Sequence, residues 1–296
     1  MIAHGFSRFS EETALHLLLL AIVNSAAMAL VLRCFSAQRG NRYAILLGNY
    51  LACVAIVLFS MGGLDSLRSA APATRLCGLI TGVLFVLNLV IMQSSIRVNG
   101  AALSSAFAKL GLLVTLTASV LFFHERPGVL QAVGIVLVLA AIMLISGRDE
   151  DAPERAPKLS LLLLTLLTGG CGDAMIKVYE QLGPAGESAV FFFFLFATSA
   201  VLTAALALFE FRRTGKKLLL TEMAAGIAVG IPNYFSSYLV LQVLRFLPAF
   251  VTYSVYSTGT ILLVLVLSAL LFREKPGKRQ LFGIALILGA LVLLNC

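Results

Sequence analysis

One stretch of the chain occurs twice. Residues 123–144 read FHERPGVLQAVGIVLVLAAIML, and residues 272–293 read FREKPGKRQLFGIALILGALVL, at a constant offset of 149. Eleven of the 22 paired positions are identical. Each copy places an acidic residue and a proline in a tight turn before an apolar run long enough to cross a bilayer. The chain is therefore a duplication, and each half should end in a membrane-spanning helix.

The turn of each copy carries a glutamate, Glu125 in the first and Glu274 in the second. A helix N-terminus presents free amide hydrogens and a partial positive charge, which favour a carboxylate. We therefore interpret both glutamates as structural helix caps.

The composition is that of a polytopic membrane protein. Of 296 residues, 60% are hydrophobic and 12% charged, and the mean hydropathy is +0.99, which excludes a soluble globular domain. The net charge of +8 does not indicate nucleic-acid binding, because the lysines and arginines fall mostly in short gaps between apolar runs, without a basic face or an aromatic platform.

Catalytic and metal-binding patterns are lacking. The five cysteines are scattered without paired spacing, and three histidines are too few and too dispersed for zinc or for a serine hydrolase. The sequence contains no phosphate-binding loop of the Walker type, so gradient-driven movement or exchange is expected rather than ATP hydrolysis. We expect no enzyme activity, no cofactor and no metal.

Ten apolar segments, five on each side of the polar stretch RDEDAPERAPK at 148–158, predict an all-α membrane protein with ten transmembrane helices. The first five-helix repeat is expected at 13–146, a linker at 147–158 and the second repeat at 159–295. Because each repeat has an odd number of helices, the repeats should be inverted, as in many secondary transporters. The expected segments are 13–32, 43–62, 75–96, 101–122, 128–146, 159–179, 188–209, 221–244, 248–271 and 277–295.

The orientation follows from the basic residues in the gaps. Fifteen lysines and arginines fall on the side of the first, third, fifth, seventh and ninth gaps, and six on the other side. This predicts that the fifteen-charge side is cytoplasmic and that both termini lie outside, in a multi-pass protein of the cytoplasmic membrane.

The repeated pattern Glu-x-Pro-Gly-x-x-Gln-x-x-Gly-Ile, closing each five-helix unit, resembles the EamA-type members of the drug/metabolite transporter (DMT) superfamily over nearly the whole chain, residues 15–294. The resemblance implies a central cavity lined chiefly by the first, third, fourth, sixth, eighth and ninth helices, alternating access and a small-molecule solute. Many relatives keep both termini in the cytoplasm, contrary to the charge count here.

Lys109 is the sharpest candidate for solute binding, because it lies near the middle of the expected fourth helix, where a cation should face a cavity or a partner. Nearby small residues, including Ser105, suit a solute surface or close helix packing. The alternative is that Lys109 neutralises a carboxylate and is structural.

Asp173, in the glycine-rich stretch 168–177 of the sixth helix, could bind an amine, carry a proton or pair with Lys109 across the cavity. A structural alternative is an ion pair with Lys177, four residues further along the helix. Lys177 and Arg33, at matching helix ends, are interpreted as residues that reach to the membrane interface.

The eighth and ninth helices supply aromatic and amide candidates. Pro232 is expected to break or bend its helix beside Asn233 and Tyr234. Tyr253 and Tyr256, on one face of the ninth helix, could stack on a ring or surround a cationic head, although core packing explains membrane tyrosines as often. By contrast, the run Phe191 to Phe194 is interpreted as lipid-exposed.

Asn88 and Gln93 complete the set, as interhelical hydrogen-bonding residues that gain weight together on cavity helices. With one basic and one acidic group plus tyrosines, an amino acid or similar zwitterion fits best, with proton or counter-solute coupling possible. The alternatives are a carrier of quaternary amines or drugs using a tyrosine-lined cavity, a lipid-handling protein and an intramembrane enzyme.

Overall fold

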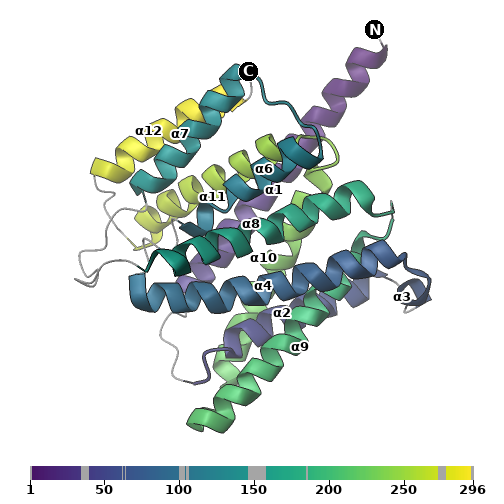
Figure 1. The fold of residues 1–296 in the computed structure, drawn as a ribbon, viewed down its shortest axis with the longest axis vertical. Coiled ribbons are helices and arrows are strands. Elements are labelled where there is room, and N and C mark those ends of the chain that lie inside the picture. Colours follow the sequence, from purple (N-terminus) through teal and green to yellow (C-terminus); the bar gives the residue numbers. More distant parts are fainter. Residues whose placement is uncertain are drawn as a thin grey trace.

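The computed structural model describes residues 2–34, 40–61, 63, 65–99, 104, 107–145, 158–184, 186–272 and 278–294, and the regular structure in these ranges is helical. The helices pack into one bundle (Figure 1). Their bounds are α1 (Ile2–Cys34), α2 (Ala44–Met61), α3 (Asp65–Ser69), α4 (Pro72–Asn99), α6 (Leu112–Phe122), α7 (Val129–Ile145), α8 (Leu159–Leu182), α9 (Ser188–Thr214), α10 (Leu220–Val243), α11 (Ala249–Phe272) and α12 (Lys278–Leu294).

The apolar helices correspond to the ten expected segments, but they differ in length. In the described residues, seven helices are long and apolar enough to cross a membrane, within α1, α2, α4, α8, α9, α10 and α11. Three shorter apolar helices occupy Phe107–Phe122, Val129–Leu144 and Leu281–Leu294. The all-helical membrane architecture is confirmed, and the number of crossings stays a prediction.

The two halves pack mainly on each other. In the first half, α2 lies on α10 and α1 lies on α10 and α11; in the second half, α9 lies on α4 and α8 lies on α4 and α6. The closing helices α7 and α12 pack together. When each helix is replaced by its counterpart in the other half, each of these contacts becomes another contact of the same set. The repeats that the sequence predicts are therefore interlocked, and neither half buries its apolar faces by itself.

Glycines set the closest of these helix crossings. A Cβ atom on Gly226 of α10 would lie 2.1 Å from the carbonyl oxygen of Ile45 in α2, and one on Gly82 of α4 would lie 2.5 Å from that of Leu195 in α9. Only small residues allow membrane helices to approach this closely. Each half therefore supplies a glycine-containing face to the other.

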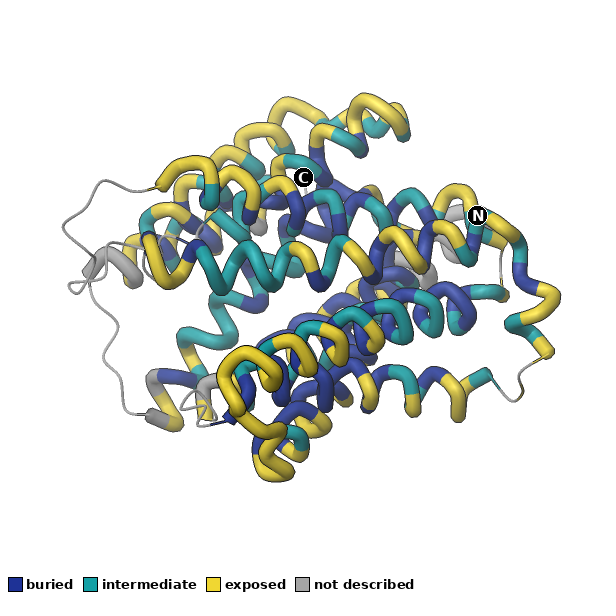
Figure 2. The backbone as a smooth tube through the Cα atoms, turned by 60° about the horizontal axis from the view of Figure 1, so that its bottom comes forward, coloured by how far each residue is buried: buried dark blue, intermediate teal, exposed yellow. Residues whose placement is uncertain are grey.

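Burial corrects the interpretation of the phenylalanine run. Exposed residues follow the outside of the bundle, as expected for a lipid-facing surface (Figure 2). Phe191 and Phe192, however, are fully buried: Phe191 stacks on Tyr179 with 4.1 Å between ring centroids, and Phe192 packs on Phe196 and Tyr234. The lipid-exposed interpretation was wrong for these two rings, because the contacts of α9 with α4 and α2 bury one face of α9.

Connections between helices gather at two ends of the bundle. At one end, which we call the basic end, Asn41 N–H donates to the Lys217 carbonyl (3.1 Å), Arg42 pairs with Glu210 (3.3 Å) and Lys158 N–H donates to Asn99 (2.6 Å). These contacts join the first gap to the seventh and the third gap to the fifth. Together with the helix ends beside them, these four gaps carry 11 of the 22 lysines and arginines.

At the opposite end of the bundle, the start of α4 meets the connection between α8 and α9. Glu125, which follows α6 and contacts α8 through Lys177, also lies at this end, which we call the Glu125 end. The Glu187 carboxylate accepts hydrogen bonds from Ala71 N–H (3.0 and 3.2 Å) and from the Thr74 hydroxyl. Because α1 ends at the basic end and α8 begins there, the two halves have opposite orientations.

Reporter fusions test the predicted orientation. We expect an alkaline phosphatase fused after the last residue to be active and a green fluorescent protein at that place to be dark, because the charge count puts the termini outside. A fusion truncated at Gly215, in an exposed turn at the basic end, should give the reverse pair of signals and is the control. A fluorescent C-terminal fusion would contradict the orientation.

Candidate functional site

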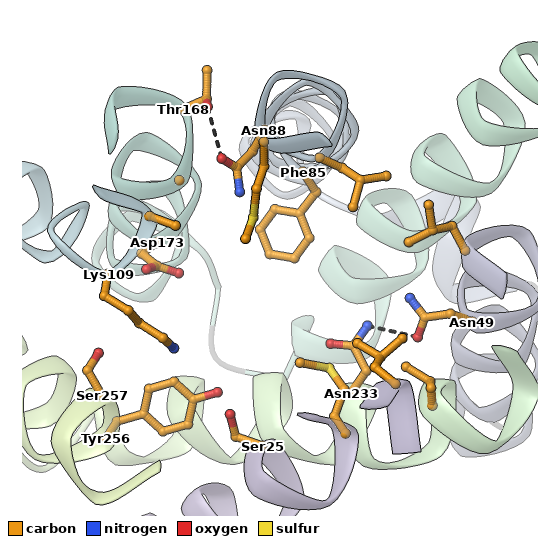
Figure 3. A pocket seen from close by; sticks show the side chains of 18 of the residues that line it. Ser25, Asn49, Phe85, Asn88, Lys109, Thr168, Asp173, Asn233, Tyr256 and Ser257 are labelled. Atoms are coloured by element: carbon orange, nitrogen blue, oxygen red, sulfur yellow. Dashed lines mark hydrogen bonds between the residues drawn. The ribbon is translucent and has the colours of Figure 1, made fainter. Parts of the chain in front are cut away.

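A cavity of about 460 Å³ lies between the two halves (Figure 3). It is bounded by α1, α2, α4, α8, α10, α11, the first residue of α6 and the residues just before α6. These are the six helices that the family resemblance implies, with α2 in addition. The lining residues are Ser25, Met28, Leu32, Ile45, Leu46, Asn49, Tyr50, Phe85, Asn88, Leu89, Met92, Ala108, Lys109, Leu112, Thr168, Gly169, Asp173, Val229, Asn233, Tyr253, Tyr256 and Ser257.

Both charged residues of the cavity reach into it from neighbouring elements (Figure 3). Lys109 lies directly before a turn at residues 110–111, beyond which α6 begins, and Asp173 lies in α8. The two charges attract each other, yet they form no direct ion pair in the described residues. A cation and an anion therefore line the same cavity, and because they do not pair directly, both charged groups can interact with a solute.

A close contact between two glycines positions Lys109 and Asp173 relative to each other. Gly111 and Gly170 face each other so closely that a Cβ atom on Gly170 would lie 2.2 Å from the Gly111 carbonyl oxygen. The Thr115 hydroxyl donates to the Gly170 carbonyl at 3.2 Å. The α6–α8 crossing thus holds Lys109 and Asp173 on adjacent walls.

Hydrogen bonds fix the two predicted tyrosines of α11. The Tyr253 hydroxyl donates to the backbone carbonyl of Asp173 at 2.7 Å, and the Tyr256 hydroxyl lies 2.9 Å from that of Ser236 in α10. Both rings line the cavity beside Lys109. Tyr253 is 3% exposed, so it connects α11 to α8 at the floor of the cavity.

Side-chain amides occupy other parts of the wall. Asn233 donates to the Asn49 side-chain oxygen at 3.1 Å, and the Thr168 hydroxyl donates to Asn88 at 3.0 Å (Figure 3). These amides come from both halves. Each asparagine offers hydrogen-bonding capacity beyond these bonds, so this wall can bind a neutral polar group.

Two predicted site residues lie elsewhere. Tyr234 is 4% exposed and points away from the cavity into a cluster with Phe192 and Tyr238, because it follows Asn233 by one residue and so faces a different side of α10. Gln93, on α4, does not line the cavity. The helix α10 continues through Pro232, so the helix does not break there, and a bend at this position stays a prediction. Ser105 and Glu274 lie outside the described residues.

The partners of Glu125 differ from those expected. Its carboxylate accepts hydrogen bonds from Ala249 N–H at 3.0 and 2.9 Å, and from the Ser119 hydroxyl. Glu125 therefore caps α11 of the second half, whereas the sequence pointed to the helix that follows it. The contact differs from the expected one because the interlocked halves bring the start of α11 to the end of α6.

Lys177 is not an interfacial residue, and it does not pair with Asp173. Its ammonium lies 3.3 Å from Glu125 and 2.9 Å from Glu180, and the residue is 3% exposed. The packing of α6 against α8 directs it inward. Asp173 is thereby left to the cavity. The side chain of Arg33 is outside the described part of the structure.

The lining residues show toward which end of the bundle the cavity extends. Leu32 lies near the end of α1 and Ile45 near the start of α2, so the wall extends toward the basic end. Toward the Glu125 end the wall stops at Asp173 and Tyr253, beyond which Ile176 and Lys177 are buried. The cavity therefore extends toward the basic end and is blocked toward the Glu125 end.

Comparison with known proteins shows the family. The model of the EamA-like transporter family matches residues 12–147 and, a second time, residues 156–296. The chain belongs to the EamA-like transporter family. This EamA-like protein is thus a membrane transporter of the DMT kind, with a small-molecule solute and the lipid bilayer as partners.

A solved structure supports the fold of this EamA-like transporter. The structure, described only as "Crystal structure of protein", superposes with a TM-score of 0.75 at 16% identity, over 95% of this chain and 96% of that one. At this identity the likeness concerns the fold alone. No curated protein matches the chain.

The structure adds cavity residues that the sequence did not single out for binding. Ser25, Thr168 and Ser257 are polar, and Phe85 and Met28 are apolar. Thr168 begins the glycine-rich stretch that drew attention to Asp173, so it could have been included. Serines in apolar helices carry no comparable signal. In the described residues, no group of three histidine, cysteine or acidic side chains could hold a metal ion.

Proposed function

We propose that this EamA-like transporter moves an amino acid or a similar zwitterion across the cytoplasmic membrane by alternating access. One observation carries the proposal: Lys109 and Asp173 line a single cavity, attract each other and yet form no direct ion pair. A solute that carries a positively and a negatively charged group a few bonds apart, as an amino acid does, can satisfy both groups at once.

Each pole of the solute has a named partner. Lys109 binds the carboxylate, and Asp173 binds the amine, together with the faces of Tyr253 and Tyr256. The cavity of about 460 Å³ is within the usual range for small-molecule sites, roughly 300–1,000 Å³.

The rest of the wall receives the solute's side chain. Asn49, Asn88 and Asn233 supply hydrogen-bonding groups, and Met28 and Phe85 supply apolar surface. A mixed wall of this kind accommodates a polar side chain with an aliphatic stem. Interlocked, inverted halves around one cavity support alternating access, because a movement of one half against the other can close one end and open the other.

The test is counterflow in proteoliposomes with a panel of amino acids, quaternary amines and sugar phosphates. We expect exchange of amino acids, and loss of this exchange when either the carboxylate or the amine of the solute is blocked. Amino-acid esters and N-acetylated amino acids provide these two controls.

The second candidate is a carrier of quaternary amines, favoured by the two tyrosines and Phe85 in the cavity wall. Transport of choline-like solutes without transport of amino acids would select this candidate and contradict the zwitterion. Chemical conversion of a solute, in place of its displacement across the sealed membrane, would contradict both.

A further inference from the structure

We propose that Lys177, Glu125 and Glu180 form an ionic latch that keeps the cavity closed toward the Glu125 end, and that must open when the solute is exposed to that side. The inference rests on the proposed function, because it assigns a gate to the transport cycle of the same cavity. It is argued from contacts that the cavity lining does not include.

The latch connects the elements that carry the cavity's charged groups. Glu125 follows α6, whose preceding residues include Lys109; Lys177 and Glu180 belong to α8, which carries Asp173. Glu125 also accepts hydrogen bonds from Ala249 N–H, at the start of the helix that carries Tyr253. One carboxylate thus holds three elements together at the Glu125 end.

The latch lies directly beyond the cavity floor. On α8, Lys177 is four residues after Asp173, and on α11, Ala249 is four residues before Tyr253, which places both about 6 Å nearer the Glu125 end at 1.5 Å per residue. The hydrogen bond from Tyr253 to the Asp173 carbonyl, 2.7 Å long, joins the same two helices one turn deeper. Two layers of contacts therefore separate the solute from the Glu125 end.

The ionic layer depends on one cation. Lys177 is 3% exposed, and its ammonium lies close to two carboxylates while the Phe123 ring is 5.8 Å away. Removing this cation leaves Glu125 and Glu180 facing each other without their shared partner, and like charges at short range repel. The layer also spans the two halves, since Glu125 is in the first and both Lys177 and Ala249 are in the second. A movement of one half against the other has to break these bonds.

Contacts at the basic end differ in kind. Arg42 and Glu210 pair at 3.3 Å, but the Arg42 side chain is 33% exposed, and the pair connects the residues just before α2 with α9, away from the cavity. This surface pair should contribute little to closure. It provides a matched control for the removal of a single ion pair.

The experiment measures the opening of the Glu125 end without any solute. Spin labels at Val129→Cys and Leu182→Cys, both exposed positions on either side of the latch, report the separation of α7 from α8 by double electron–electron resonance in nanodiscs. The five native cysteines are replaced by serine or alanine. We expect Lys177→Met to increase the long-distance population about tenfold, which corresponds to about 1.4 kcal/mol.

Two further variants make the result specific. Lys177→Arg should restore the short distance, because it keeps the cation, and Arg42→Gln should leave the distribution unchanged. If Lys177→Met does not fold, Glu180→Gln should shift the distribution in the same direction by a smaller amount, since it keeps the Lys177–Glu125 pair. The proposal is overturned by an unchanged distribution in folded Lys177→Met or Glu180→Gln, or by an equal shift in Arg42→Gln. Because no solute is present, failure to transport amino acids would overturn the proposed function and leave this result intact.

Discussion

Lys109→Met is expected to weaken the transport of a zwitterionic solute by roughly 10- to 100-fold. A hydrogen bond to a charged group contributes about 1.5–3 kcal/mol, and each 1.4 kcal/mol is a factor of ten in affinity. Lys109 lines the cavity beside Asp173, so its loss removes the proposed partner of the solute carboxylate and leaves Asp173 without this neighbouring cation. The apparent KM for counterflow should rise accordingly.

The control for this substitution is Lys216→Met, which removes a lysine from an exposed position at the basic end and should transport as the wild type does. Asp173→Asn should impair transport as Lys109→Met does, because the proposed solute needs both poles. If folded Lys109→Met protein transports amino acids normally, Lys109 is structural and the zwitterion site is wrong. Size-exclusion profiles and thermal unfolding show whether each variant is folded.

Gly170→Ala is expected to lower the apparent Tm by roughly 5 to 10 °C, the second large effect. A Cβ atom at this position would lie 2.2 Å from the Gly111 carbonyl oxygen and 2.5 Å from the Val114 Cβ atom. Neither the Gly111 carbonyl group nor the Val114 Cβ atom can move away without separating α6 from α8. The measurement is thermal unfolding in detergent. Unfolding is monitored by the fluorescence of a thiol-reactive dye, because the chain has no tryptophan.

Gly169→Ala is the matched control, one residue away on the same helix. Its Cβ atom would meet the Asn88 side chain at 3.5 Å, an ordinary contact, from a position that lines the cavity. Alanine also favours a helix over glycine by about 1 kcal/mol. The Tm of Gly169→Ala should therefore equal or exceed that of the wild type. Equal loss of stability in both variants would show that the α6–α8 crossing is not the cause.

The candidate site was only partly predictable from sequence, and the reason differs between residues. Lys109 and Asp173 could be found because a charge in an apolar helix is costly anywhere except at a cavity or a partner. Tyr234 and Gln93 could not be excluded, because tyrosine and glutamine are compatible with core, interface and cavity positions alike. Asn49 and Asn233 form one hydrogen-bonded pair, yet they are 184 positions apart and belong to different halves.

The sequence by itself determined the membrane class, the duplication and the order of apolar segments, because these depend on local composition and on a repeat at a constant offset. Tertiary structure alone decided the partners: Glu125 caps α11, Lys177 is buried between two glutamates, and Phe191 and Phe192 face inward. The physical reason is that each helix buries its face against the other half of the chain. The buried face of each helix depends on crossings between glycines that are far apart in the sequence, such as Gly111 with Gly170. No local sequence pattern encodes which two glycines meet.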